Sequence, residues 1–121
     1  WMRKPDDLLE SKALDERDML ENLGLAVINR RLQAIGRSAE PPFIAGGAFK
    51  NDQYGAVRVT TFAATAQPTE WQAAVEALDA EQRRALQYGV RQDELDREVA
   101  TMRTLLAAAA YLALLKFKKL I

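Results

Sequence analysis

The sequence predicts an α+β fold in which amphipathic helices are layered on one face of an antiparallel sheet, in the order helix, strand, strand, helix, helix. Two observations predict it. In three long segments, apolar residues recur every three or four positions, which is typical of helices with one buried face. Between the first and second of these segments the helical pattern disappears. Residues 43–66 are instead rich in Gly, Thr, Val and aromatic side chains, which indicates strands.

The first helix is predicted over residues 15–36. Asp15 suits the N-cap position, and Gly36 lies where a left-handed C-cap residue belongs. Pro41 and Pro42 then prevent any continuation of the helix. The apolar stripe of this helix comprises Met19, Leu20, Leu23, Val27, Ile28, Leu32 and Ile35.

The strands are predicted as a hairpin. Residues 57–64 alternate with a period of two, residues 43–49 are the expected partner strand, and residues 50–55 form the bend. Gly46 and Gly47 favour a bulge or a close approach of another group to the backbone. Residues 1–10 are interpreted as a loop or the remnant of an incoming strand. Because two strands make a marginal sheet, we expect further strands from another chain or from residues outside this sequence.

The second helix is predicted to begin at Pro68 with a cap between Thr69 and Gln72, and to end at Gly89. Trp71 is expected to anchor the core. The opposite face is expected to be solvated, and it carries Glu76, Asp79, Glu81, Arg83 and Arg84.

The third helix is predicted to begin at Asp93 and Glu94 and to end near Lys116, Lys118 and Lys119, where cations suit the helix dipole. Its apolar run, 105–115, is shorter than the roughly 20 residues needed to span a bilayer. It is therefore interpreted as a buried helix end, and no membrane partner is expected.

The composition excludes several functions. The 121 residues suffice for a single domain, 1–121, and 17 basic residues balance 17 acidic ones, so we expect no nucleic-acid partner. With no His and no Cys, the chain lacks the usual zinc, copper and haem ligands and has no thiol nucleophile. No carboxylate pair suits acid/base catalysis, so we expect no catalytic residue, no metal site and no cofactor in this chain.

Lys50 and Tyr54 are the candidate substrate-contact residues, because both are predicted in the bend between the strands and loops on rigid elements commonly contact ligands. Solvation of the turn is the alternative for both. The pairs Arg30–Arg31 and Arg83–Arg84 suit either carboxylate recognition or a solvated helix face. Beside Gly46 and Gly47, an exposed strand edge would let an extended peptide add to the sheet.

Several segments together resemble the pitrilysin/insulinase family of zinc peptidases, and in particular a non-catalytic domain of its bacterial members. The resemblance runs from about residue 15 to 105, and residues 105–121 depart from it. It is carried by Gly24-Leu25-Ala26-Val27-Ile28-Asn29-Arg30-Arg31-Leu32, Arg37-Ser38-Ala39-Glu40-Pro41-Pro42-Phe43-Ile44, Val57-Arg58-Val59-Thr60-Thr61, Glu70-Trp71, Arg84-Ala85-Leu86-Gln87-Tyr88-Gly89 and Glu94-Leu95-Asp96-Arg97-Glu98.

The resemblance implies a parent peptidase whose paired α+β domains enclose a chamber, with zinc held by an H-x-x-E-H helix in the catalytic domain. This chain has no His and therefore contains no such motif. The family's domains are longer, so the resemblance implies a partial domain that forms chamber wall, packs against other domains of the parent and positions extended peptide. It also suggests the bacterial periplasm or cell envelope. The alternative is a stand-alone homodimeric interaction module.

Overall fold

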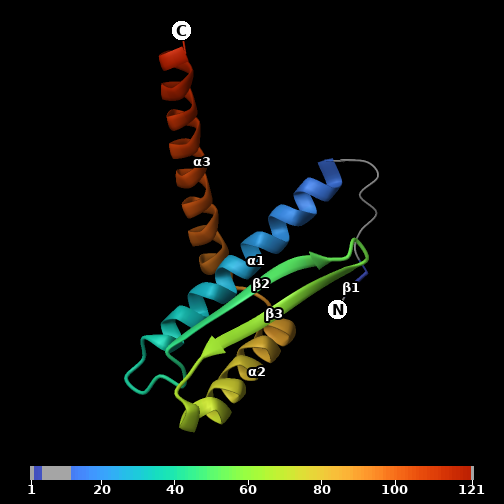
Figure 1. The fold of residues 1–121 in the computed structure, drawn as a ribbon, viewed down its shortest axis with the longest axis vertical. Coiled ribbons are helices and arrows are strands. Elements are labelled where there is room, and N and C mark those ends of the chain that lie inside the picture. The colour runs from blue at the N-terminus through green and yellow to red at the C-terminus, as the bar shows by residue number, and fades with distance from the viewer. Residues whose placement is uncertain (1, 4–11, 121) are drawn as a thin grey trace. The chain divides into compact units, whose positions relative to one another are not determined.

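A computed structural model describes residues 2–3 and 12–120 of the chain, which divides into two compact units, Trp1–Val90 and Arg91–Ile121. The first unit has the element order β1, α1, β2, β3, a short 3₁₀ turn and α2 (Figure 1). The second unit contains α3. Their bounds are β1 (Met2–Arg3), α1 (Lys12–Gly36), β2 (Ala45–Gln53), β3 (Val57–Thr65), η1 (Pro68–Glu70), α2 (Trp71–Tyr88) and α3 (Gln92–Leu120). The predicted α+β class and element order are confirmed.

The sheet of the first unit is antiparallel and has the strand order β1-β3-β2 within the described residues. The hairpin register runs without interruption from Ala45 opposite Thr65 to Gln53 opposite Val57. The bend is therefore shorter than predicted, with Tyr54 at φ 55° and Gly55 at φ 67°. Of the segment predicted as a loop or strand remnant, residues 2–3 pair with β3, and residues 1 and 4–10 lie outside the described residues.

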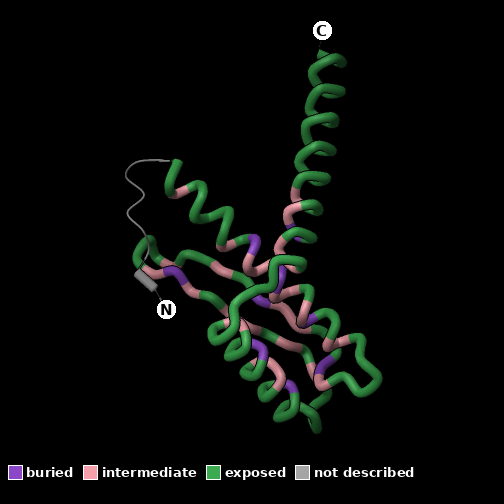
Figure 2. Tube along the Cα trace, turned by 180° about the vertical axis from the view of Figure 1, so that it is seen from behind, coloured by how far each residue is buried: buried purple, intermediate pink, exposed green. Residues whose placement is uncertain are grey.

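The core lies where α1, the hairpin and α2 meet (Figure 2). The buried residues Leu32, Phe43, Ala48 and Ala74 form its centre, and partly buried residues of both helices pack against them. Because Ala48 lies opposite Phe62 in the register, these two side chains share one face of the sheet, and both belong to this core. Helices α1 and α2 thus cover the same face, as predicted.

Gly46 is required for the packing of this core. A Cβ atom added at Gly46 would lie 2.9 Å from Cε2 of Phe43, whose side chain is fully buried. The predicted close approach is confirmed at this position. The predicted alternative, a bulge, is absent from the hairpin, since its register is continuous through residues 45–53.

The helix ends differ from several predictions. Helix α1 begins before Asp15, so that residue lies in its first turn. Gly36 does not have a positive φ, because the last turn is tightened by hydrogen bonds from the Arg37 N–H to the carbonyls of Gln33 and Ala34. By contrast, Gly89 has φ 66° and donates to the Ala85 carbonyl, which confirms it as the residue that ends α2.

Two predictions about the start of α2 are wrong. The cap between Thr69 and Gln72 does not form, since the 3₁₀ turn η1 precedes α2 and its N-cap makes no side-chain hydrogen bond. Trp71 is 64% exposed and does not anchor the core. The contact with the sheet is made instead by Ala74, Ala77 and Leu78, one to two turns further along.

Helix α3, taken by itself, is exposed from Arg103 to Leu120 (Figure 2). The prediction that residues 105–115 form a buried helix end is wrong. Within the described part of the second unit there is no further element to cover this helix. By length and composition α3 would suffice to cross a membrane, because it has 29 residues and an 18-residue window of mean hydropathy 1.4.

Candidate functional site

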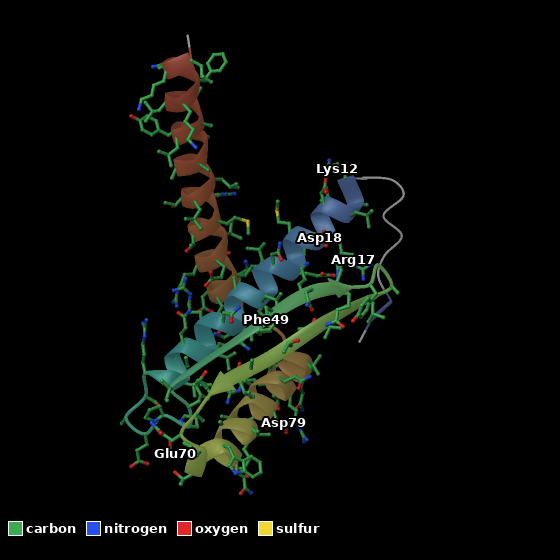
Figure 3. The ribbon with its side chains drawn as sticks, viewed as in Figure 1. Lys12, Arg17, Asp18, Phe49, Glu70 and Asp79 are labelled. Atoms are coloured by element: carbon green, nitrogen blue, oxygen red, sulfur yellow. The ribbon has the colours of Figure 1, made fainter. Side chains whose placement is uncertain are left out.

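A cluster of charged side chains lies between α1 and the hairpin. We define the charged cluster as Arg17, Asp18 and Glu21 of α1, with Lys50, Asp52 and Arg58 of the strands. The strand residues lie at alternating positions on the helix-covered face, since Asp52 pairs with Arg58 and Lys50 with Thr60 in the register. Figure 3 labels Arg17 and Asp18 on α1.

Arg58 is the centre of the charged cluster. Its Nε and Nη2 atoms donate to Oδ1 and Oδ2 of Asp52 at 2.8 and 3.3 Å. Its Nη1 atom donates to Asp18 Oδ1 at 3.0 Å and to Glu21 Oε2 at 2.9 Å. Because the Arg58 side chain is only 9% exposed, these bonds replace the water that a guanidinium would otherwise bind.

The charges of the cluster balance, with three carboxylates facing three cations. Burial opposes ionisation of Glu21, but hydrogen bonding from Lys50 and the charges of Lys50 and Arg58 outweigh it and lower the pKa of Glu21 below 4.5. Burial likewise opposes ionisation of Asp18, while Arg58 and Lys50 lower its pKa below 3.8. Hydrogen bonding to Asp52 raises the pKa of Arg58. Asp18, Glu21 and Arg58 therefore stay charged at neutral pH, and the cluster joins α1 to the hairpin.

The two candidate substrate-contact residues lie in different surroundings. Lys50 is a strand residue rather than part of the bend, and its Nζ atom donates to Glu21 at 2.7 Å and to Asp18 at 3.5 Å. Its side chain is only 16% exposed. Tyr54 is in the bend as predicted and is 99% exposed. The structure does not bring Lys50 and Tyr54 together as one site.

A second buried ion pair joins α1 to α2. Glu81, predicted on the solvated face, is 1% exposed and accepts a hydrogen bond from Nη1 of Arg31 at 3.3 Å. Arg31 also donates to the carbonyl of Gly89 at 3.1 Å, and Arg84 lies 3.5 Å from the other Glu81 oxygen. The prediction that Arg31 and Glu81 lie on solvated helix faces is therefore wrong, because the two side chains form an ion pair between α1 and α2.

Among the described residues, the outer edge of β2 is occupied by another part of the fold, whereas most of the outer edge of β3 is not. The Asn29 side chain donates to the Ala48 carbonyl and accepts from the Ala48 N–H, both at 2.7 Å. The backbone groups of Ala48 therefore point away from β3, and the outer edge of β2 is occupied there by a side chain of α1. This protects β2 from pairing with another strand.

The register also shows in which direction the backbone N–H and C=O groups of β3 point. In an antiparallel pair, the backbone N–H and C=O groups of two directly opposite residues either all point toward each other or all point away. Since those of Ala48 point away from β3, the N–H and C=O of its partner Phe62 point away from β2. By the period of two, those of Thr60 and Ala64 do so as well. Strand β1 pairs only with Val57 and Arg58 among the residues the structure describes. The open edge, defined as residues 59–65 of β3, thus has no strand beside it in the ranges 2–3 and 12–120.

Next to the open edge, the sheet has a shallow depression of about 270 Å³ that is lined mainly by small residues. Phe49 is its one large side chain, is 51% exposed and is labelled in Figure 3. The depression is lined by Ala45, Gly46, Gly47, Phe49, Ala63, Ala64 and Thr65. Apart from Phe49, an extended chain next to β3 would meet a surface of small, uncharged side chains.

The residues described give no support for a catalytic or metal centre in this chain. No group of three or more His, Cys, Asp or Glu side chains among residues 12–120 is arranged to hold a metal ion. Each carboxylate of the charged cluster is paired with a cation. Comparison of the chain with protein-family models, curated protein sequences and solved structures found no match.

Sequence reasoning missed the charged cluster and the difference between the two strand edges. A signal for the cluster is present in the sequence, because Lys50, Asp52 and Arg58 recur with a period of two at positions that face the helices. Charged residues at inward positions of a half-buried strand require partners. The role of Asn29 has no comparable signal, since a polar residue in a helix is usually solvated.

Proposed function

We propose that the chain is a non-catalytic α+β domain of a zinc peptidase of the pitrilysin/insulinase type, where it forms chamber wall, packs against other domains and positions extended peptide. The resemblance of residues 15–105 to that family motivates the proposal. The α+β order of the described elements is compatible with it. The chain contains no His, so proteolysis and zinc binding would belong to other parts of the parent protein.

The observation that carries the peptide-positioning role is the open edge of β3. Its outward N–H and C=O groups, at Thr60, Phe62 and Ala64, offer main-chain hydrogen bonds to an added strand. Main-chain bonding is tolerant of side-chain sequence, as a domain that holds varied peptides requires. The adjacent depression of small residues leaves room for the alternate side chains of such a peptide.

Peptide titration followed by NMR tests this role. With an unstructured peptide, we expect the amide signals of Thr60, Phe62 and Ala64 to shift, whereas the Ala48 amide stays in place because Asn29 holds it. Thr60→Pro removes one outward N–H without removing a bond to β2, so it should retain the circular dichroism of the parent chain and weaken the peptide response. Unchanged spectra at saturating peptide would contradict the proposal.

A second candidate function, a stand-alone homodimeric module, is favoured by the large apolar side chains that are exposed. They include Met19 and Leu20 of α1 and Phe49 of the sheet. Sedimentation of the purified chain distinguishes the two functions. A defined dimer whose formation is abolished by Phe49→Ser would support the module, and a monomer that binds peptide at β3 would support the peptidase domain.

A further inference from the structure

The apolar part of α3 is exposed around its whole circumference. Residues 105–115 are all apolar and make about three helical turns at 3.6 residues per turn, so every side of the helix presents apolar side chains. Leu105, Leu106, Leu112 and Leu114 are each more than half exposed. A helix that is apolar all round needs apolar surroundings on all sides, which a single docking groove does not provide.

The charges that flank this segment favour anionic lipid over a second copy of α3 as its surroundings. Arg103 precedes it, Lys116, Lys118 and Lys119 follow it, and residues 99–121 contain no Asp or Glu. A second copy of α3 that covered residues 105–115 with its own residues 105–115 would place cation beside cation in a parallel pair, and Arg103 beside the lysines in an antiparallel pair. Both arrangements are repulsive. Anionic lipid headgroups, by contrast, complement positive charge at both ends of an apolar segment.

We propose that α3 inserts into an anionic lipid bilayer through residues 104–115. This segment is about 18 Å long at roughly 1.5 Å per residue, which is less than the ~30 Å of the hydrocarbon core. The aliphatic stems of Arg103 and Lys116 make up part of the difference by extending their charged ends toward the headgroups. The 18-residue window of mean hydropathy 1.4 contains at most two charged residues, as this arrangement requires.

This inference replaces the sequence-based expectation of no membrane partner, which rested on the shortness of the 105–115 run and on its predicted burial. The exposure of α3 removes the second ground. The membrane proposal does not rest on the proposed peptidase role, since α3 and the open edge belong to different units. Each is tested by a different readout.

Vesicle flotation of the full chain tests the proposal. We expect the chain to float with vesicles of phosphatidylcholine and phosphatidylglycerol, and less with phosphatidylcholine alone. Leu112→Asp places a carboxylate inside the apolar segment and should lower vesicle partitioning by roughly a hundredfold. Leu86→Asp is the matched control, because Leu86 is an exposed leucine of α2, and it should leave partitioning unchanged.

The lysines are tested in the same assay. Replacing Lys116, Lys118 and Lys119 by Gln should weaken binding to the anionic vesicles by roughly a hundredfold and bring it close to binding to neutral vesicles. Three results would each overturn the proposal: a parent chain that does not float, equal loss in Leu112→Asp and Leu86→Asp, or binding that needs the lysines but survives Leu112→Asp. The last would show adsorption to the lipid surface without insertion.

Discussion

Arg58 shows how a single buried charge connects separate parts of the first unit. Asp18 and Glu21 come from α1 and Asp52 from the facing strand, and all three accept hydrogen bonds from the one guanidinium. A planar group with several fixed donors suits this task better than an ammonium group does. Without Arg58, three carboxylates would remain close together, with Lys50 and Arg17 as the remaining cations of the cluster.

Replacing Arg58 should therefore cost more than the loss of an ordinary surface ion pair. We expect Arg58→Met to lower the free energy of unfolding by about 1–3 kcal/mol, because it leaves three partly buried carboxylates without their main hydrogen-bond donor. Arg58→Lys retains the charge but not the planar set of donors. Its free energy of unfolding should therefore lie between those of the parent chain and Arg58→Met. Urea unfolding monitored by circular dichroism measures both. A loss below about 1 kcal/mol, typical of exposed pairs, would contradict the structural role of Arg58.

At this scale the sequence alone predicted little of the candidate site. Tyr54 lies in the bend as predicted, because Gly55 is a local turn signal, whereas Asn51 and Asp52, which are also turn residues by type, belong to β2. The surroundings of Lys50 and Glu81 differ from the prediction, since their partners Glu21 and Arg31 are distant in the chain. Pairing between distant residues depends on how the helices dock, and side-chain periodicity along one element carries no information on that.

At the scale of the element, predictions succeeded where one physical signal dominated. The alternation of residues 57–64 predicts β3 to within a residue, and Gly89 ends α2 with a positive φ that glycine adopts readily. Helix starts were less predictable. At α2, the 3₁₀ turn that begins at Pro68 replaces the side-chain cap expected at Thr69. Several capping arrangements satisfy the same backbone groups, and local sequence does not choose among them.

Gly46 of β2 and Gly24 of α1 differ in their packing, so the same change to Ala should have opposite effects on stability at the two positions. Gly46→Ala should destabilise the first unit by about 1–3 kcal/mol, because the new Cβ would lie 2.9 Å from the buried Phe43 ring. Gly24 lies inside α1 with no atom within 4 Å of an added Cβ. Gly24→Ala should therefore stabilise the chain by about 0.5–1 kcal/mol, since Ala favours the helix more than Gly does.

Thermal unfolding of the two variants beside the parent chain measures this difference. The same Gly-to-Ala change should move the midpoint in opposite directions, down for Gly46 and up for Gly24. If Gly46→Ala were as stable as the parent chain, Phe43 would not pack against residue 46 as described. If Gly24→Ala were destabilising, α1 would have a neighbour at that position.

At the scale of the whole molecule, the sequence predicted the class of fold but not which surfaces are left open. The one-sided stripes of α1 and α2 require a shared sheet face, and the structure has that arrangement. The open edge of β3 follows from the strand order β1-β3-β2 and from the pairing of β1 with Val57 and Arg58 alone among the described residues, which periodicity does not reveal. The exposure of α3 is likewise a property of how few elements the second unit has among the described residues.

The charged cluster also makes the stability of the chain depend on pH. Because the pKa values of Asp18 and Glu21 are lower in the folded state than their ordinary values of 3.8 and 4.5, the unfolded chain binds more protons in acid. Their stabilising contribution is complete above these ordinary values. It is lost as the pH falls below 4.5 and through the lower pKa values of the folded state.

Urea unfolding between neutral pH and pH about 3 tests this dependence. The parent chain should lose stability steeply in the acid range. A chain with Asp18→Asn and Glu21→Gln should be less stable at neutral pH and change less in acid, so that the two curves of stability against pH approach each other.

The comparison of these two chains isolates the charged cluster. The lowered pKa of Asp93, caused by hydrogen bonding from Arg91, is common to both chains and cancels in the comparison. Glu40→Gln, at an exposed position outside the cluster, should follow the parent chain throughout. Parallel curves for the parent and the double variant would show that the ion pairs with Arg58 and Lys50 do not stabilise the fold.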